Sequence, residues 1–163
     1  MEKKSVAVTV ELKAAVSDLY DDYAQTIDDE ELDRWPDFFT EDALYRVISR
    51  ESHCLGLTHA TIYCEGLGMI RDRANMIDRV SVYEPRVLRH FISGLRIHSV
   101  SDTSVQASAN FLIIESLFDA EPTVLMVGQY RDEIVRKDGQ LLFRRRDAIY
   151  DQYRIRTTLV MPV

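Results

Sequence analysis

The sequence changes from a helical to a strand pattern within residues 69–96, which contain Met69-Ile70-Arg71-Asp72-Arg73, Val82-Tyr83-Glu84-Pro85-Arg86 and Arg89-His90-Phe91-Ile92. A proline pushes the residue before it out of the helical region of backbone conformations, so a helix should end at this corner. The alternating residues that follow favour a long strand. We therefore expect the corner to determine how a helix lies on a sheet.

The residues before the corner carry helical patterns. Apolar side chains recur at three- and four-residue spacing in residues 12–26 and again in residues 65–82, which predicts an amphipathic helix in each segment. A shorter helix is expected in residues 29–38, where Pro36 requires the helix to begin late or to turn. We also expect a loose arm at residues 1–11 and a first strand at residues 42–48. Between this strand and the second long helix, residues 49–61 predict a loop with room for a short strand.

After the corner the pattern becomes that of strands. Four β-branched and aromatic runs are separated by short turn signals, which is typical of antiparallel hairpins. The pair Asp138-Gly139 is a strong signal for a two-residue hairpin turn. The four runs are residues 89–100, 105–118, 123–137 and 141–153. They are longer than the usual strand of about five or six residues, which predicts a strongly curved sheet.

Helices followed by a curved meander predict an α+β fold, with the N-terminal helices packed on one face of a strongly curved antiparallel sheet. A sheet that curls around its helices forms a cone, as in NTF2-like and ketosteroid-isomerase-like proteins, and we expect this architecture by analogy. A chain of 163 residues is long enough for one core, so we expect a single cone domain over residues 1–163.

Acidic residues are concentrated in the first part of the chain. Residues 1–44 contain 13 acids and 4 bases, a net charge of −9, whereas residues 45–163 contain 14 acids and 16 bases, a net charge of +2. A nucleic-acid-binding domain normally presents a basic stripe, so this distribution argues against nucleic acid as a partner. The run Arg144-Arg145-Arg146 lies in an alternating segment, where we expect two solvated arginines around a paired one.

Cysteine usage and hydropathy predict the compartment. Cys54 and Cys64 fit a reducing environment better than a disulfide framework. Residues 1–10 lack the charged-then-apolar pattern of a signal segment, and no apolar run approaches the roughly 20 residues needed to cross a bilayer. We therefore expect a cytoplasmic protein that does not bind membranes.

The residues that usually bind metals or attack substrates are not spaced for such chemistry. His90 and His98 share one face of a predicted strand, but about 26 Å separates them at about 3.3 Å per residue, so they cannot share an ion. Cys54 and Cys64 are not followed by the closely spaced histidines that a mixed Cys/His iron–sulfur cluster requires. The sequence also lacks a Gly-x-Ser-x-Gly turn and a glycine-rich phosphate loop. We therefore expect no metal, cofactor or nucleophile in this chain.

General acid–base chemistry inside a cone is the enzymatic alternative. A carboxyl or imidazole group in an apolar cavity has a pKa shifted toward neutrality, and Asp42, Tyr45, Asp72 and His90 are the candidates for an isomerase or dehydratase. The corner, however, mixes acids and arginines almost equally. Opposite charges hold each other ionised and in place, which favours a structural joint or an interface.

Several segments carry a resemblance to a known family. They are residues 32–42, Tyr45, residues 69–73, residues 83–86 and Arg89-His90, and they occur in this order over nearly the whole chain. Together they resemble the small (β) subunit of aromatic-ring-hydroxylating (Rieske-type) dioxygenases. The resemblance implies a cone fold in which the small subunits form a trimer and assemble with a large (α) subunit as an α3β3 hexamer. It also implies that the Rieske [2Fe-2S] cluster and the mononuclear non-haem iron(II) lie in the large subunit, while the small subunit is structural.

The resemblance extends to substrate class and to contact residues. Residues 35–50 and 66–73 look most like small subunits whose complexes attack carboxylated single rings, such as terephthalate, salicylate or anthranilate. Where family members often carry an asparagine soon after the strand histidine, this chain has Ser93-Gly94. We expect the apolar tail, residues 144–163, to contribute to subunit contacts. The expected joint or interface residues are Trp35, Asp72, Arg73, Tyr83, Glu84, Arg86, Arg89, His90, Tyr150 and Tyr153.

Overall fold

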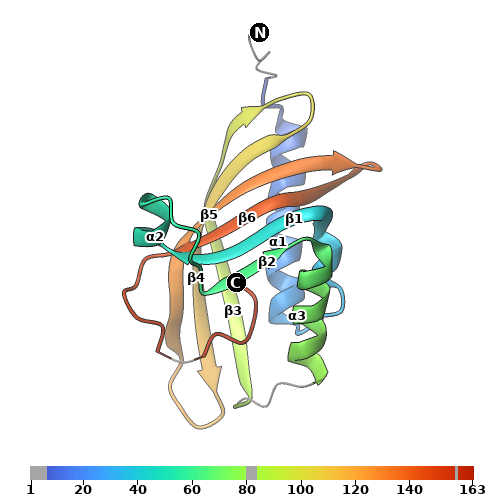
Figure 1. Ribbon diagram of the computed structural model, residues 1–163. Coiled ribbons are helices and arrows are strands. Elements are labelled where there is room, and N and C mark those ends of the chain that lie inside the picture. Colours follow the sequence, from blue (N-terminus) through green and yellow to red (C-terminus); the bar gives the residue numbers. More distant parts are fainter. Residues whose placement is uncertain (1–6, 80–83, 157) are drawn as a thin grey trace.

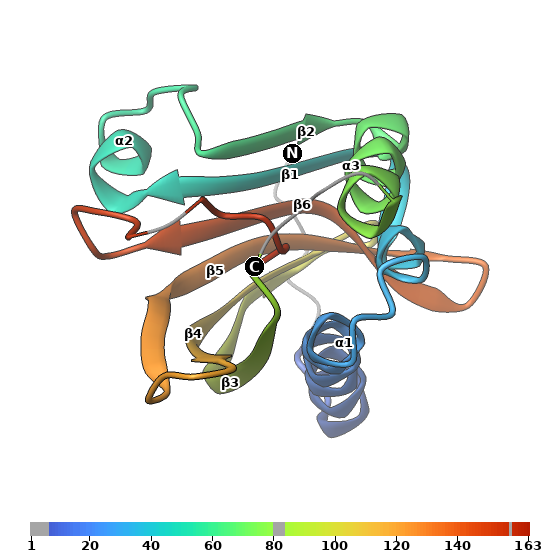
Figure 2. The same ribbon diagram turned by 90° about the horizontal axis from the view of Figure 1, so that it is seen from below.

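The computed structural model describes residues 7–79, 84–156 and 158–163. Within these residues six strands form one sheet in the order β2-β1-β6-β5-β4-β3, and the sheet curls around two long helices (Figures 1 and 2). The helical elements are α1 (Val10–Asp28), the 3-10 helix η1 (Trp35–Phe38), α2 (Arg50–Cys54) and α3 (Leu67–Arg79). The strands are β1 (Phe39–Ser49), β2 (Ile62–Glu65), β3 (Arg86–Val100), β4 (Val105–Leu117), β5 (Thr123–Lys137) and β6 (Gln140–Tyr150). The predicted α+β architecture, with helices on a strongly curved sheet, is confirmed.

Helix α1 lies along the concave side of the sheet and packs chiefly against β3 (Figure 2). It begins at Val10 because Thr9 caps it: the Thr9 Oγ1 atom accepts a hydrogen bond of 3.1 Å from the Leu12 main-chain N–H. The helix therefore includes the last two residues of the segment that was predicted to be a loose arm. Its buried face contains Val16, Tyr20 and Tyr23, as the helical spacing predicted.

The short helix predicted for residues 29–38 is reduced to η1. Glu30 has a positive φ of 59°, which breaks the helical path directly after α1. Pro36 lies in the first turn of η1, where its missing N–H costs no helical hydrogen bond. The sequence pattern therefore located the late start at Pro36 but overestimated the length of the helix.

Two short elements in residues 49–65 change the predicted path of the chain. Ser49 caps α2, since its Oγ atom accepts a 3.1 Å hydrogen bond from the Ser52 main-chain N–H. Strand β2 pairs antiparallel with β1 and ends at Glu65, the residue at which the second long helix was predicted to begin. Gly66, with a φ of +83°, separates β2 from α3. Helix α3 extends to Arg79 in the described residues. The end that the sequence predicted for this helix, near Pro85, falls partly on residues 80–83, which lie outside the described residues.

The sheet is mixed rather than purely antiparallel. Strands β3 to β6 form the predicted antiparallel meander, and the hairpin between β5 and β6 turns at Asp138 and Gly139, both with positive φ. Strand β1, however, pairs parallel with β6, so the expectation of an antiparallel sheet throughout was wrong. No hairpin joins these two strands, and turn spacing therefore carries no information on their relative direction. No helix in the described part of the chain is long and apolar enough to span a membrane.

Bulges in β3 alter which residues face the interior. The pairing of β3 with β4 shifts between Ser93 and Arg96 and again after Ile97, and Gly94 has a φ of +64° at the first shift. His90 lies opposite buried Ile113 and faces the core, whereas the bulges turn His98 toward Ser108 on the other face. The prediction that the two histidines share a face was therefore wrong, because a bulge reverses the alternation.

Candidate functional site

A fully buried arginine occupies the interior of the cone. Arg146 on β6 is 0% exposed, and its guanidinium carbon lies 3.8 Å from the ring centroid of Tyr130, 4.0 Å from that of Tyr23 and 4.2 Å from that of Phe143. The ring of Tyr20 is 4.9 Å away. Aromatic faces attract a cation through their quadrupole. Because these rings come from α1, β5 and β6, Arg146 joins the helix to the sheet.

Asp132 on β5 is the counter-ion of this arginine. One of its carboxylate oxygens lies 3.6 Å from Arg146 Nη2 and accepts a hydrogen bond from the Tyr20 hydroxyl. Burial raises the pKa of Asp132 to about 6, and Arg146 opposes that rise. Burial also raises the pKa of Tyr23 to about 12, so this phenol stays neutral at pH 7. The contacts of Asp132 within the described residues are those of a buried ion pair.

The stability of the folded chain should depend on the ionisation of Asp132. Its folded-state pKa of about 6 exceeds the value of roughly 4 expected in the unfolded chain, so the folded state binds this proton more tightly. The resulting stabilisation is complete below pH 4 and is lost as the pH rises through 6. The unfolding free energy of the wild type, minus that of Asp132→Asn, should therefore fall by up to about 3 kcal/mol between pH 4 and pH 7. Urea denaturation at several pH values measures this difference, and a constant difference would contradict it.

The arginine run differs from the prediction of two solvated arginines around a paired one, because each of the three arginines contacts an acid and Arg146 is buried. The pairing of β5 with β6 shifts between Glu133 and Ile134, which changes the alternation within the run. As a result Arg144 and Arg145 are both about half-exposed, with side chains 44% and 46% accessible, while Arg146 points inward. Arg144 pairs with Glu133 at 2.6 Å.

A second buried pair joins the end of α1 to β3. One carboxylate oxygen of Asp28 accepts a hydrogen bond from the main-chain N–H of His90 at 2.8 Å. The other carboxylate oxygen lies 2.5 Å from the ring Nδ1 of His90. Both side chains are buried, and the imidazole Nε2 has no hydrogen-bond partner within the described residues. Arg89 lies on the surface, 3.9 Å from the same carboxylate. His90 is therefore held by Asp28, which was not among the residues predicted from the sequence.

The other corner residues are arranged mainly around Arg86. Its Nη1 atom contacts Glu115 at 2.6 Å, with both side chains below 10% exposure, and its Nε donates to the Glu84 carbonyl oxygen at 3.1 Å. The Glu84 residue itself is exposed, as is Asp72 on α3. Tyr83 lies outside the described residues. The corner is thus several separate contacts rather than one converging cluster.

The remaining predicted residues divide between interior and surface. Trp35 is fully buried, and its ring lies edge-on to Tyr45 at a centroid distance of 5.2 Å. Arg73 on α3 donates to main-chain carbonyls of the tail. The Tyr150 hydroxyl lies 3.0 Å from Thr61 Oγ1, whereas Tyr153 is 99% exposed.

Two of the groups proposed for acid–base chemistry are outside the interior. Asp42 is exposed and accepts a hydrogen bond of 2.8 Å from Thr40, and Asp72 is exposed on α3. Neither candidate is a cavity carboxylate, because each residue falls on the outward side of its element. Tyr45 is buried, and burial raises its pKa further, so it is a poor proton donor or acceptor at pH 7. His90 is buried but already engaged with Asp28.

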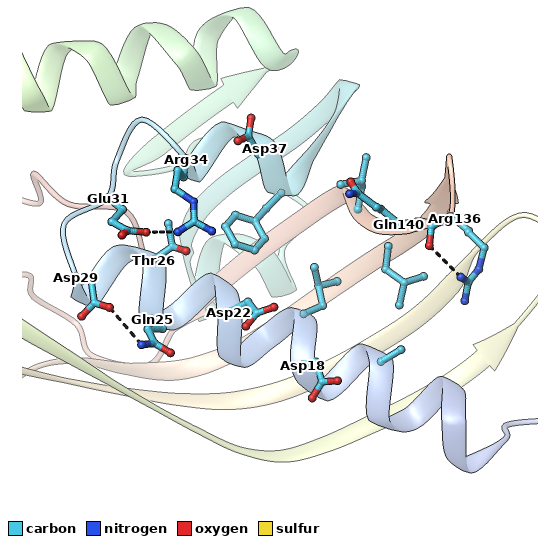
Figure 3. Close-up of a pocket in the computed structure, with 16 residues that line it drawn as sticks. Asp18, Asp22, Gln25, Thr26, Asp29, Glu31, Arg34, Asp37, Arg136 and Gln140 are labelled. Atoms are coloured by element: carbon cyan, nitrogen blue, oxygen red, sulfur yellow. Dashed lines mark hydrogen bonds and ion pairs between the residues drawn. The ribbon is translucent and has the colours of Figure 1, made fainter.

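An open groove of about 750 Å³ lies between α1, η1 and the β5–β6 hairpin (Figure 3). Five acids line it, and they belong to the acidic N-terminal part of the chain: Asp18, Asp22, Asp29, Glu31 and Asp37. Arg34 pairs with Glu31, and Arg136 donates to the Gly139 carbonyl. Part of the negative charge of residues 1–44 is therefore gathered at this groove, which disfavours anionic ligands there.

A polar row crosses the outer face of the sheet. Arg46 on β1 makes a bidentate contact with Asp147 on β6, at 2.7 and 2.8 Å, and Arg145 shares the same carboxylate at 3.0 Å. A pocket of about 460 Å³ beside this pair is lined in part by His53 and Arg131. Burial lowers the pKa of His53. This face therefore combines arginines and acids, since Arg131 and Arg145 line the pocket together with Glu133 and Asp147.

Sequence reasoning missed Asp28, Asp132 and Arg146. A signal for Asp132 was present, because it is a charged residue at a position where strand alternation predicts an apolar side chain, between the buried Tyr130 and Ile134. Within the residues that the structure describes, no group of three or more His, Cys, Asp or Glu side chains is arranged to hold a metal ion.

Comparisons with known proteins identify related sequences. The SnoaL-like domain family matches residues 8–147. The chain is similar to the small subunit of anthranilate 1,2-dioxygenase from Burkholderia cepacia, with 32% identity over 141 residues that cover 86% of this chain and 88% of the relative. It is also similar to the β 1 subunit of the terminal oxygenase component of terephthalate 1,2-dioxygenase from a Comamonas species, with 30% identity covering 86% and 92%.

A solved structure shows the same likeness in three dimensions. It is the provisionally assigned β subunit of an aromatic-ring-hydroxylating dioxygenase from Novosphingobium aromaticivorans. Its superposition on this chain gives a TM-score of 0.85 with 32% identity, covering 93% of this chain and 96% of that one. The cone architecture and the sequence similarity therefore agree over nearly the whole length.

Proposed function

We propose, on the premise that this chain belongs to the SnoaL-like domain family and to the small (β) subunits of aromatic-ring-hydroxylating dioxygenases, that it is the non-catalytic assembly subunit of such an enzyme. The observation that carries the proposal is the state of the buried ionisable groups. Asp28 is engaged with His90, Asp132 with Tyr20 and Arg146, and Arg86 with Glu115. A raised pKa such as that of Asp132 occurs in structural ion pairs as well as in catalytic sites, and the paired state of all three groups supports a structural role.

The redox chemistry belongs, in this proposal, to a partner. A Rieske [2Fe-2S] cluster and a mononuclear non-haem iron(II) would both be held by a large (α) subunit, in an α3β3 assembly with a trimer of small subunits. The described residues of this chain do not offer the sets of Cys, His or carboxylate ligands that such centres need. In this proposal, the role of this chain is to position and stabilise the subunit that binds iron.

The proposed substrate class is a single aromatic ring that carries a carboxylate. The support comes from the relatives, whose names specify anthranilate and terephthalate as substrates. Substrate contact would be made in the large subunit, so this chain would influence the choice of ring only through the shape of the assembly.

Contact with the partner subunits would use exposed apolar side chains and arginines, which are enriched at protein interfaces. Tyr153 is 99% exposed, and Phe91 on β3 and Val127 on β5 are about half-exposed. We expect only part of residues 144–163 to contact other subunits, because Met161 and Val163 are buried in the core of this chain itself. Tyr153 is the tail residue that we assign to a subunit contact.

Co-expression with a large subunit tests this proposal. The chain purified alone should contain no iron and should not turn over anthranilate or terephthalate when a reductase and NADH are supplied. With its large subunit it should co-purify at equal stoichiometry and restore turnover. A Tyr153→Asp variant should co-purify less well, whereas Val10→Asp, 81% exposed at the start of α1, serves as the matched control. Turnover by the chain alone would overturn the non-catalytic role, and failure to co-purify would overturn the assembly role.

A further inference from the structure

Two arginines lie close together on the outer face of the sheet. Arg131 on β5 is paired with Ser108 on β4 and with Asp147 on β6, and Asp147 is paired with Arg46 on β1. Arg145 faces the same way as Asp147, because its Nε contacts the Asp147 carboxylate at 3.0 Å. Arg131 and Arg145 are therefore diagonal neighbours on adjacent strands, with Cβ atoms about 7–8 Å apart. Their long side chains can reach one ligand between them.

Both arginines keep their terminal nitrogens available. Arg131 donates from Nε to the side-chain oxygen of Gln129 at 3.2 Å, and Arg145 donates from Nε to Asp147. Among the described residues, the Nη1 and Nη2 atoms of these two arginines make no hydrogen bond or ion pair. The Nε contacts orient each guanidinium and leave its two terminal nitrogens able to bind a carboxylate in a bidentate manner.

A pocket of about 460 Å³ opens at these two side chains. Its walls include His98 on β3, whose Nε2 lies 2.7 Å from Ser108 Oγ, and His53 on α2, the short helix that contacts β1 and β6 (Figure 1). None of the described residues that line the pocket is Phe, Tyr or Trp. A ligand in this pocket would therefore be recognised by its polar groups and not by stacking of an aromatic ring.

The acids that line the pocket are already paired with arginines. The pairs are Asp147 with Arg46 and Arg145, Glu133 with Arg144, and Asp132 with Arg146. Arg131 has no acidic partner among the described residues. These pairs and Arg131 together comprise five arginines and three acids, a net charge of +2. The excess positive charge favours an anionic ligand, and a dianion would neutralise it.

We propose that this pocket binds a short aliphatic dicarboxylate, with one carboxylate on Arg131 and the other on Arg145. Two carboxylates joined by two methylene groups, as in succinate, present one planar group to each guanidinium. Arginine binds such planar groups through two parallel hydrogen bonds. The ligand charge of −2 matches the net charge around the pocket. The inference concerns the outer face of this chain alone and is independent of the proposed function.

Titration calorimetry of the full chain with succinate, acetate and inorganic phosphate, at constant ionic strength, tests the site. Succinate should bind at least about tenfold more tightly than acetate, because it makes charge-assisted hydrogen bonds to a second guanidinium. Phosphate should also bind more weakly than succinate, since its oxygens surround a single atom and cannot meet both guanidinium groups in bidentate geometry. Equal affinities for succinate and acetate, or for succinate and phosphate, would overturn the proposal.

Substitutions of single arginines separate this site from a general attraction to positive charge. Arg131→Gln and Arg145→Gln should each reduce the affinity for succinate to that for acetate. Arg131→Lys keeps the charge but loses the planar fork, so it should weaken succinate by about five- to tenfold. Arg136→Gln is the matched control, because it removes the same charge near the hairpin end of β5, where Arg136 donates to the Gly139 carbonyl oxygen.

The control variant should change the affinity for succinate by less than about twofold, since Arg136 does not line the pocket. Arg131 and Arg145 are exposed, so both sets of variants should remain folded, which circular dichroism establishes. Equal weakening by Arg131→Gln and Arg136→Gln would overturn the proposal, because binding would then follow net charge alone. Undiminished succinate affinity in Arg131→Lys would overturn it for the same reason.

Discussion

The Arg146→Ala variant should lose about 3–5 kcal/mol of unfolding free energy at pH 7, because it leaves the carboxylate of Asp132 buried without its counter-ion. Asp132 is 3% exposed, and its nearest cation is the Arg146 guanidinium, 3.6 Å away. The substitution also removes a side chain packed against three rings at 3.8 to 4.2 Å, which adds a cavity cost. Urea denaturation followed by circular dichroism measures the loss.

Two controls separate the buried charge from the lost volume. The double variant Arg146→Met with Asp132→Leu replaces both partners by apolar side chains and should recover most of the stability, since removing a whole buried pair is often close to neutral. Arg145→Ala alters the neighbouring arginine, which is about half-exposed, and should cost less than about 1 kcal/mol. The defect of Arg146→Ala should also diminish at pH 5, where Asp132 is protonated. Equal losses in Arg145→Ala and Arg146→Ala would contradict this account.

The sequence predicted the long elements well because their patterns are strong. The helix over residues 12–26 and the four strands after the corner were found within a few residues of α1 and β3 to β6. The short strand allowed for in residues 49–61 was placed too early, because the four residues of β2, Ile62–Glu65, are too few to show alternation. The parallel pairing of β1 with β6 could not be predicted, since it joins segments about a hundred residues apart with no connecting hairpin.

The site residues were harder to predict than the elements. His90 was selected from the mixed charges of the corner, but Asp28, its partner, lies 62 residues earlier at the end of a helix. Local charge patterns cannot show such a contact. The buried pair of Asp132 and Arg146 was missed for a different reason: the register shift after Glu133 moved Arg146 to the interior, and bulges are not visible in a simple alternation.

The His90→Ala variant should lose about 3 kcal/mol of stability, while complexes that still assemble keep normal turnover per iron. The imidazole is fully buried, and its Nδ1 lies 2.5 Å from the Asp28 carboxylate, whose other oxygen accepts from the main-chain N–H of residue 90. Removing the ring leaves one oxygen of a buried carboxylate unpaired and loosens the end of α1 from β3. The expected result is therefore less assembled enzyme, measured by size-exclusion chromatography, with an unchanged rate once activity is normalised to iron content.

The turnover rate per iron distinguishes a structural role of His90 from a catalytic role. If His90 moved a proton in the reaction, its loss would lower turnover per iron by a factor of about 10²–10⁴, even in fully assembled complexes. Arg89→Ala is the matched control, since this residue is adjacent, about half-exposed and 3.9 Å from the same carboxylate, and it should cost less than about 1 kcal/mol. Asp28→Asn should reproduce the assembly defect of His90→Ala, because it removes the charge from the same buried contact. A variant series in which His90→Ala lowers the rate per iron but Asp28→Asn does not would place His90 in the chemistry instead of the joint.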